Sequence, residues 1–413
     1  MPKSLHRRIY NKTVKPLLNV ITFRPVRKYI KNKLLCKKNI NKNYINSVKD
    51  LIQILKNEDI VYAMVSIEWN AVLYHRHQHM ALKLAQKGYK VLYAEYNNIL
   101  NEFKFEKNEH NIIFVDKNIF EYLPKEIAKK INLFIPNPLP FFTYEKMSKL
   151  SKLGYNFIYD YLDAFDDAIN GGNREQLKVF NNLEKFNPFL ILATAKNLYE
   201  QMVVRFDKKK VLLNQNAVNI LNFQNINSEI PSDLRNIIDQ NRPVVGYIGA
   251  LAPWIDWKLL NFCIEQRPQY NFVLIGVDYG NALKNLNFKD NVYFLGSKKH
   301  NELPQYLQYF TCCTIPFESG DIAKSTNPLK LFEYMASGKQ VICTKDLLEC
   351  YGFKGVYIAN DMIDFVDKID MAIANSDDNI LSLQLKNYAN LNTWEKRIED
   401  IIDRVNLIKG ENK

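Results

Sequence analysis

The stretch STNPLKLFEYMASGKQVICT, residues 325–344, contains the signals of a helix followed by a strand. Asn327 is a favourable N-cap residue, Pro328 suits the first helical position, and Gly338 is placed to end the helix. The run QVICT after the glycine is apolar and β-branched, as expected of a buried strand. The segment therefore predicts a helix that begins in a loop at the edge of a sheet and leads into the next strand.

The same alternation of short apolar runs with helical patterns extends over most of the chain. In the first half the apolar runs cover residues 60–69, 89–96, 111–116, 131–138, 156–163, 189–196 and 211–218. In the second half they cover residues 244–251, 271–276, 291–296, 312–317, 340–345 and 355–360. Apolar strands that alternate with crossover helices form a parallel sheet covered on both faces. We therefore predict an α/β protein with two doubly wound, Rossmann-like domains that face a cleft, where ligands bind outside the carboxyl ends of the strands.

The sequence predicts five parts. An asparagine-rich polar stretch separates the two halves and is predicted to be a linker. The last helical pattern carries an apolar stripe that must pack on another element. The parts are a basic tail over residues 1–43, a first α/β domain over 44–218, a linker over 219–241, a second α/β domain over 242–390, and a C-terminal helix over 391–413 that docks back toward the first domain.

The net charge of +12 is concentrated in the tail. Residues 1–43 hold 13 Lys and Arg residues and no Asp or Glu, so the rest of the 413-residue chain is nearly neutral. No apolar run in the tail approaches the ~20 residues needed to cross a bilayer. The spacing of Val26, Ile30 and Leu34 among basic residues leaves two interpretations open: a short amphipathic helix on an anionic membrane surface, or a solvated tail. Nucleic-acid binding is not expected.

Cysteine usage and the N-terminal sequence bear on the compartment. The six cysteines show no C-x-x-C pair and no zinc-ligand spacing, and no cleavable signal peptide is recognisable. Cysteines of this kind behave as small apolar residues in a reducing environment. We expect a cytoplasmic protein, in contact with the inner face of the cell membrane if the tail binds there.

The start of the helix in the opening stretch is suited to an anion. Free backbone N–H groups at a helix N-terminus, with Ser325 and Thr326 before it and Lys330 in its first turn, can hold a diphosphate. Glu333 lies one turn further along, where its carboxylate can accept two hydrogen bonds from the 2′,3′-diol of a ribose. Alternatively, Glu333 is an i, i+3 salt-bridge partner of Lys330.

These residues also carry a family resemblance. The runs NPLKLFEYMASGKQVICT, VVGYIGAL, NVYFLGSKKHNELPQYL and CTIPF resemble the nucleotide-binding half of GT-B glycosyltransferases of the retaining group 1 (family 4) class, of the bacterial surface-polysaccharide and teichuronic-acid type. RHQHMALKLAQKGYKVLYAEY and YDYLDAFDD resemble its acceptor half more weakly, so the resemblance covers roughly residues 60–405.

The resemblance implies a nucleotide-sugar donor, UDP- or GDP-linked, held as a substrate by the second domain, with no further cofactor and no metal. Glu333 matches the glutamate that binds the ribose. The loop and first turn before it would surround the diphosphate, and Gly249 would let the backbone approach the donor. The residues so implied are Ser325, Thr326, Asn327, Pro328, Leu329, Lys330, Glu333 and Gly249.

The sequence departs from the family pattern at two places. Ser325 stands where many members have the first glutamate of an E-x7-E motif, near the donor sugar. Many members also carry an Arg and a Lys after the first strand of this half to neutralise the diphosphate, whereas here only Lys258 is near that place. Lys258 is therefore the candidate diphosphate contact after this strand, and phosphate neutralisation is less well provided than in those members.

Two polar clusters in the first half are expected at the other wall of the cleft. In HRHQH, residues 75–79, His77 points away from the helix face that His75 and His79 share, so a metal site is disfavoured. A contact from Arg76 or a histidine to phosphate or acceptor is favoured, and a plain polar surface is the alternative. In YDYLDAFDD, Asp160 and Asp163 end a strand and either bind acceptor hydroxyls or cap the next helix. Arg76, Asp163 and Lys330 are the predicted catalytic residues.

The expected activity is transfer of a sugar from a nucleoside-diphosphate donor to a hydroxyl of a glycan or lipid-linked acceptor in surface-polysaccharide biosynthesis, with the retention that the resemblance implies. Two alternatives remain at this point. One is a GT-B-type nucleotide-sugar epimerase, which needs carboxylates and a histidine around the donor sugar. The other is a non-catalytic, basic-tailed protein that binds membrane or nucleic acid.

Overall fold

The computed structural model describes residues 42–71, 74–97, 104–105, 111–137, 139–165, 174–224 and 226–411. The chain divides into two compact units, residues 1–56 and 57–413, and each is considered by itself. The described part of the first unit is helix α4 (Lys42–Lys56). The predicted membrane contact of the basic tail lies almost entirely outside the described residues. Within the described part of the chain, no helix has the length and apolar character that a bilayer crossing requires.

The second unit begins with an eight-stranded sheet in the order β3-β4-β2-β1-β5-β6-β7-β8. All neighbouring strands are parallel except β3 and β4, which pair antiparallel at one edge. The strands are β1 (Val61–Ser66), β2 (Lys90–Glu95), β3 (Lys104–Phe105), β4 (Ile112–Val115), β5 (Ile131–Asn137), β6 (Asn156–Tyr161), β7 (Leu190–Ala193) and β8 (Val211–Leu213). We call this sheet with its helices the first lobe.

A six-stranded sheet follows, in the order β11-β10-β9-β12-β13-β14, with every neighbouring pair parallel. Its strands are β9 (Val244–Ile248), β10 (Asn271–Ile275), β11 (Val292–Phe294), β12 (Cys312–Ile315), β13 (Val341–Thr344) and β14 (Val356–Ala359). We call this sheet with its helices the second lobe. The predicted class, an α/β protein with two doubly wound parallel sheets, is confirmed.

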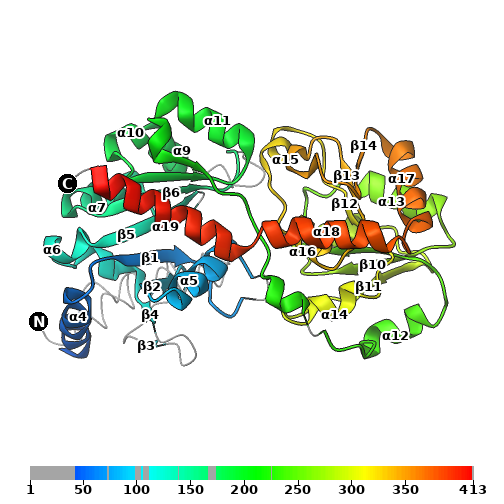
Figure 1. Ribbon diagram of the computed structural model, residues 1–413, viewed down its shortest axis with the longest axis horizontal. Coiled ribbons are helices and arrows are strands. Elements are labelled where there is room, and N and C mark those ends of the chain that lie inside the picture. Colours follow the sequence, from blue (N-terminus) through cyan, green and yellow to red (C-terminus); the bar gives the residue numbers. More distant parts are fainter. Residues whose placement is uncertain are drawn as a thin grey trace, which may run out of the picture. The chain divides into compact units, whose positions relative to one another are not determined.

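Helices flank both sheets, as Figure 1 shows. Those of the first lobe are α5 (Arg76–Gln86), α6 (Lys125–Ala128), α7 (Tyr144–Leu153), α9 (Arg174–Asn181), α10 (Leu183–Phe186) and α11 (Lys196–Arg205). Those that follow are α12 (Ser232–Ile238), α13 (Trp257–Gln266), α14 (Leu303–Leu307), α15 (Asp321–Ser325), α16 (Leu329–Ala336), α17 (Met362–Ala374), α18 (Asn379–Leu391) and α19 (Trp394–Glu411). Short 3-10 turns are η2 (Lys117–Glu121), η3 (Lys208–Lys210), η4 (Ile220–Phe223), η5 (Ala282–Asn285) and η6 (Leu348–Cys350).

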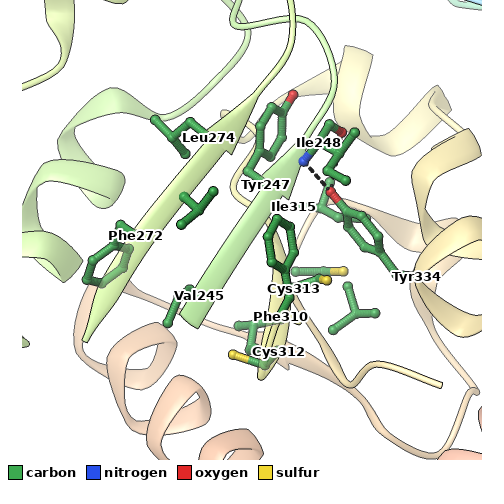
Figure 2. Close-up of a cluster of buried hydrophobic side chains, with 14 of the residues drawn as sticks. Val245, Tyr247, Ile248, Phe272, Leu274, Phe310, Cys312, Cys313, Ile315 and Tyr334 are labelled. Atoms are coloured by element: carbon green, nitrogen blue, oxygen red, sulfur yellow. Dashed lines mark hydrogen bonds between the residues drawn. The ribbon is translucent and has the colours of Figure 1, made fainter. Parts of the chain in front are cut away.

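The core of the second lobe fixes the helix that carries Glu333. Strands β9, β10 and β12 bury continuous apolar runs, because helices cover both faces of a parallel sheet. Tyr334 of α16 is fully buried among these strands, and its hydroxyl accepts a hydrogen bond of 2.8 Å from the backbone N–H of Ile248 (Figure 2). This contact ties α16 to the carboxyl end of β9 and so sets the direction of the neighbouring Glu333 side chain.

Two segments outside the sheets pack closely. In α19, Trp394, Ile398, Ile401 and Val405 are buried in the core of the first lobe, where α19 contacts α5. Their helical spacing forms the apolar stripe that needed a partner. The segment predicted as a linker, residues 219–241, includes η4 and α12, and α12 packs into the core of the second lobe.

Candidate active site

A pocket of about 290 Å³ lies where the carboxyl ends of the two sheets face each other. The first lobe contributes residues that follow β1, β6, β7 and β8, and the second lobe contributes residues at the ends of β9, β10 and β11 together with α16. Ligands of doubly wound sheets bind at this position. The lining residues are Tyr74, His75, Arg76, Leu162, Asp163, Thr194, Asn216, Ile248, Gly249, Ile275, Gly276, Ser297, Lys298, His300, Leu303, Leu329, Lys330 and Glu333.

Helix α16 begins one residue later than predicted, and its N-cap residue is Pro328. The Asn327 side chain does not cap the helix, because its Oδ1 accepts the backbone N–H of Asn216 at 2.8 Å. The predicted N-cap role of Asn327 is therefore wrong. The loop before α16 faces the first lobe, so Ser325, Thr326, Asn327 and Pro328, predicted around a diphosphate, do not line the pocket. Leu329, Lys330 and Glu333 do line it.

Lys330 extends from the first turn of α16 toward Gly249. Its Nζ lies 4.6 Å from the ring centre of Phe317 and 5.0 Å from that of Tyr247. Gly249 has φ +146°, and a Cβ at this position would lie only 2.7 Å from Lys330 Cε, so only glycine leaves room for this side chain. Burial lowers the pKa of Lys330 to about 8, although the nearby Glu333 carboxylate favours the charged form.

Glu333 pairs with a residue that the sequence reasoning did not single out. Its Oε1 lies 2.8 Å from Nε2 of His300, and the Glu333 side chain is almost completely buried. The His300 ring in turn stacks on Tyr74 of the first lobe, with 5.4 Å between ring centres. In the described part of the chain no ion pair joins Glu333 to Lys330, so the predicted i, i+3 salt bridge is not formed.

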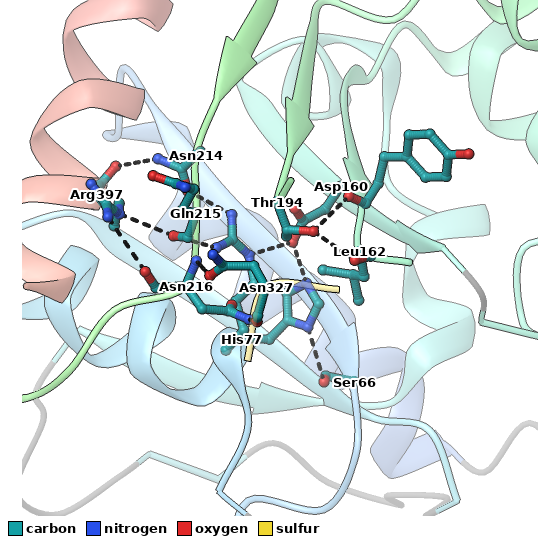
Figure 3. A network of polar contacts seen from close by, with 12 residues as sticks. Ser66, His77, Asp160, Leu162, Thr194, Asn214, Gln215, Asn216, Asn327 and Arg397 are labelled. Atoms are coloured by element: carbon teal, nitrogen blue, oxygen red, sulfur yellow. Dashed lines mark hydrogen bonds and ion pairs between the residues drawn. The ribbon is translucent and has the colours of Figure 1, made fainter. Parts of the chain in front are cut away.

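Arg76 is held by the interior of the first lobe. Its Nε donates to Asp160 Oδ2 at 3.0 Å, and its other nitrogens donate to the Asn214 side chain and the Gln215 carbonyl. His77 Nε2 lies 2.9 Å from the same Asp160 oxygen (Figure 3). Burial disfavours the Asp160 carboxylate, but Arg76 and His77 outweigh this and hold its pKa below the usual range.

This network changes the predicted role of Asp160. The residue is completely buried and does not line the pocket, so the expectation that it binds acceptor hydroxyls is wrong. Its carboxylate is held by Arg76 and His77, both from α5. Arg76 reaches the pocket only in part, because most of its hydrogen-bonding capacity is used inside the lobe.

Asp163 lies two residues beyond β6, at the wall of the pocket. Burial, together with repulsion from Asp160, raises its pKa to about 6. A carboxyl group with such a pKa changes charge near neutral pH and can accept or donate a proton there. Asp163 is therefore the first-lobe side chain best suited to an acceptor hydroxyl.

The histidines of residues 75–79 have three different surroundings. His75 is the N-cap residue of α5 and lines the pocket, whereas His77 binds Asp160. His79 stacks on Trp394 with 5.0 Å between ring centres. Burial lowers the pKa of His75 to about 4 and that of His79 well below the usual range. In the part of the chain that the structure describes, the three histidines do not form a cluster that could hold a metal ion.

The structure does not bring Lys258 to the pocket. It is exposed on α13, whose opposite face is buried, and it does not line the cavity. His300 and Tyr74 do line it, and neither was predicted from the sequence. His300 follows Gly296 in the loop after β11, and a polar side chain just beyond a parallel strand is the signal that would have indicated it.

Comparisons with known proteins agree with this geometry. The family model of group 1 glycosyl transferases matches residues 242–375. Bacillus subtilis (strain 168) TuaH, to which a glycosyltransferase role in teichuronic acid biosynthesis has been assigned, is 25% identical over 177 residues. That match covers 40% of this chain and spans 44% of TuaH, less than half of the relative's length.

Solved structures of the same fold cover most of the chain. Sucrose-phosphate synthase from Thermosynechococcus elongatus superposes with a TM-score of 0.60 at 15% identity, over 85% of this chain and 100% of that one. HepE from Anabaena, in complex with UDP, superposes with a TM-score of 0.60 at 14% identity, over 84% of this chain and 100% of that one. Residues 242–375 are thus a group 1 glycosyl transferase domain, carried in a chain with the GT-B fold.

Proposed function

We propose that the protein is a glycosyltransferase that takes a sugar from a nucleoside-diphosphate donor and transfers it to a hydroxyl of a glycan or lipid-linked acceptor. The observation that carries the proposal is the placement of Lys330 and Glu333 on one helix wall of the interlobe pocket, within the group 1 domain. A cation and a carboxylate one turn apart match a diphosphate and a ribose diol.

The chemistry proposed for the second lobe is stabilisation of the leaving group. The N–H groups at the start of α16 and the Lys330 ammonium would take up negative charge that develops on the diphosphate. One carboxylate oxygen of Glu333 is held by His300. The other oxygen would accept a hydrogen bond from a ribose hydroxyl. Gly249 would leave the backbone open to the donor.

The first lobe would supply the acceptor side. Asp163 would orient the attacking hydroxyl, and Arg76 would hold the wall that carries it. The family resemblance favours retention of configuration, in which the leaving phosphate accepts the proton. Attack assisted by Asp163 as a base would invert the anomeric centre instead. NMR of the product's anomeric proton distinguishes these two outcomes.

A role in surface-polysaccharide biosynthesis is supported by the likeness to TuaH. For the donor, UDP is the first nucleotide to test, because HepE was solved in complex with it. We also propose that the protein acts in the cytoplasm, with the tail over residues 1–43 on the inner face of the cell membrane. The full chain should co-sediment with anionic vesicles. Deletion of residues 1–43 should abolish this co-sedimentation and leave nucleotide binding by the pocket unchanged.

The deciding experiment is a thermal-unfolding screen against UDP, GDP, ADP, CMP and TDP, followed by calorimetric titration. A nucleotide that binds the folded state stabilises it by about 2.7 kcal/mol at 100 times its Kd. We expect one nucleoside diphosphate to raise the unfolding temperature, and Glu333→Ala to reduce the rise. No response to any nucleotide would contradict the proposal.

One observation favours a second candidate, a nucleotide-sugar epimerase. Such an enzyme needs a histidine and carboxylates around the donor sugar, and the pocket holds His300 beside Glu333. NMR of the donor incubated without acceptor separates the two functions. A new sugar epimer with intact diphosphate would identify an epimerase, and release of the nucleotide on addition of acceptor would identify a transferase.

A further inference from the structure

A buried carboxylate, Glu349, joins the two lobes outside the pocket. It belongs to η6, which follows β13 of the second lobe, and only 9% of the residue is exposed. Its Oε1 accepts the backbone N–H of Lys196, the first residue of α11 in the first lobe, at 2.7 Å. Its Oε2 accepts hydrogen bonds from the side chains of Gln215 and Asn327.

Two of the three donors to this carboxylate, Lys196 and Gln215, come from the opposite lobe. Within the described part of the chain, Glu349 has no ion pair, so three hydrogen bonds and the N-terminal end of α11 are the interactions that offset its burial. If the lobes separated, two of the donors would be lost. The contact therefore favours the arrangement of lobes in which they are present.

The loop before α16 adds further bonds across the same junction. Asn327 accepts the Asn216 backbone N–H at 2.8 Å, and its carbonyl accepts the Asn216 side chain at 2.7 Å. Ser325 Oγ accepts the Asn197 side chain at 2.9 Å. Figure 3 shows Asn327 beside the segment Asn214–Asn216, which Arg397 also holds through the Gln215 carbonyl. The N-terminal end of α16 is thus anchored to the first lobe.

We propose that Glu349 is a positioning residue that locks α16 to the first lobe. Glu349 and the segment over residues 325–327, from the end of α15 to the start of α16, set the separation between two pocket walls. One wall carries Lys330 and Glu333, and the other carries Asp163. The junction itself does not depend on the proposed function; its consequence for sugar transfer does. On this assignment, residues 325–327 hold the lobes together rather than binding phosphate.

The test measures lobe separation directly, by double electron–electron resonance on the full chain. Val204 on α11 and Ile380 on α18 are 86% and 79% exposed and accept spin labels once changed to Cys. The five cysteines in the described part of the chain are buried, and Cys36→Ser removes the remaining thiol. Glu349→Ala is compared with Glu349→Gln, which can still accept the Lys196 N–H, and with Glu265→Gln on the exposed side of α13 as the matched control.

We expect one narrow distance distribution for the parent and for Glu265→Gln. Glu349→Ala should shift the ratio of long to short distances at least about tenfold, since several buried donors lose their acceptor. Glu349→Gln should restore part of the short population. Because only folded molecules give a defined distance, lower stability alone does not produce this shift. Distributions identical in all four proteins would overturn the proposal.

A functional readout separates this inference from the proposed function. The residues proposed to hold the donor lie in the second lobe, so the Kd for UDP should change less than about threefold in Glu349→Ala. Turnover of UDP-glucose should fall at least about tenfold, because the two walls no longer align. Absence of UDP binding by the parent would count against the donor assignment alone, while the distance measurement would still decide on the junction.

Discussion

The Nε2 atom of His300 lies 2.8 Å from the Oε1 atom of Glu333, and the two side chains meet from different elements of the second lobe. His300 comes from the loop after β11, and Glu333 from α16. The imidazole holds one carboxylate oxygen and is itself fixed by stacking on Tyr74. The orientation of Glu333 is therefore set before any ligand arrives, which is the condition for selective recognition of a diol.

The first prediction concerns discrimination between ribose and deoxyribose. The parent should bind UDP about 5- to 150-fold more tightly than 2′-deoxy-UDP, because an unpaired buried carboxylate oxygen costs about 1–3 kcal/mol. Glu333→Ala should remove this preference, and His300→Ala should weaken it without abolishing it. Titration calorimetry with both nucleotides measures the ratio, with Glu265→Gln as control. A preference that survives in Glu333→Ala contradicts the ribose role.

The second prediction follows from the lowered pKa of Lys330, about 8. Its ammonium loses the proton as the pH rises through that value, so affinity for a nucleoside diphosphate should fall between about pH 7 and about pH 9. A bound diphosphate favours the charged form, so binding should take up a proton near pH 8. Calorimetry in buffers of different ionisation enthalpy detects this uptake.

Two variants identify the cation responsible. Lys330→Met should bind about 10- to 100-fold more weakly and lose the pH dependence, because a charge-assisted contact is worth about 1.5–3 kcal/mol. Lys258→Met should behave like the parent, since Lys258 is exposed and does not line the pocket. If Lys258→Met is the variant that weakens binding, the position of the diphosphate proposed here is incorrect.

Local sequence signals were sufficient for α16 and for every strand except the short edge strand β3, which was not predicted. Apolar runs and crossover helices predicted both sheets, because burial on both faces of a parallel sheet leaves a continuous apolar pattern. Proline at the start and glycine after the end located α16 to within one residue. The pocket positions of Lys330 and Glu333 followed from the rule that helix N-termini in such folds face the cleft.

Contacts between distant segments could not be predicted in this way. Asn327 has the sequence context of an N-cap, but its side chain binds Asn216, which only the packing of the two lobes brings near. The sequence alone does not distinguish Asp160 from Asp163, since both lie near the carboxyl end of the same predicted strand. Which of them is buried depends on α5, which places Arg76 and His77 on Asp160. One sequence contains no direct signal for such pairings.

The third prediction tests whether Arg76 acts mainly through Asp160. Arg76→Ala leaves a buried carboxylate without its cation, so the free energy of unfolding should fall by about 3–5 kcal/mol. Adding Asp160→Asn should recover part of this loss, because the double variant no longer buries an unpaired charge. Urea unfolding of the single and double variants measures both changes. Additive losses would show that the two residues are not coupled.

The fourth prediction rests on the raised pKa of Asp163, about 6 against an ordinary value of 3.8. The folded protein binds this proton more tightly than the unfolded chain does. The resulting contribution to the free energy of unfolding is fully present below about pH 4 and is lost as the pH rises through about 6. Such a shift corresponds to at most ~3 kcal/mol, and partial exposure of the side chain reduces it to about 1–2 kcal/mol. Asp163→Asn should therefore be more stable than the parent at about pH 7.5, and no more stable at about pH 4.

Activity should respond in the opposite sense, because the carboxylate form is the one that can accept a hydrogen bond or a proton from an acceptor hydroxyl. Transfer by the parent should decline below about pH 6. If the group acts as a base, Asp163→Asn should lower kcat about 10²- to 10⁴-fold above that pH, and the difference should narrow below it. A loss in acceptor affinity with kcat nearly unchanged would instead assign Asp163 to binding alone. A variant that is both as active and as stable as the parent at about pH 7.5 would remove Asp163 from the site.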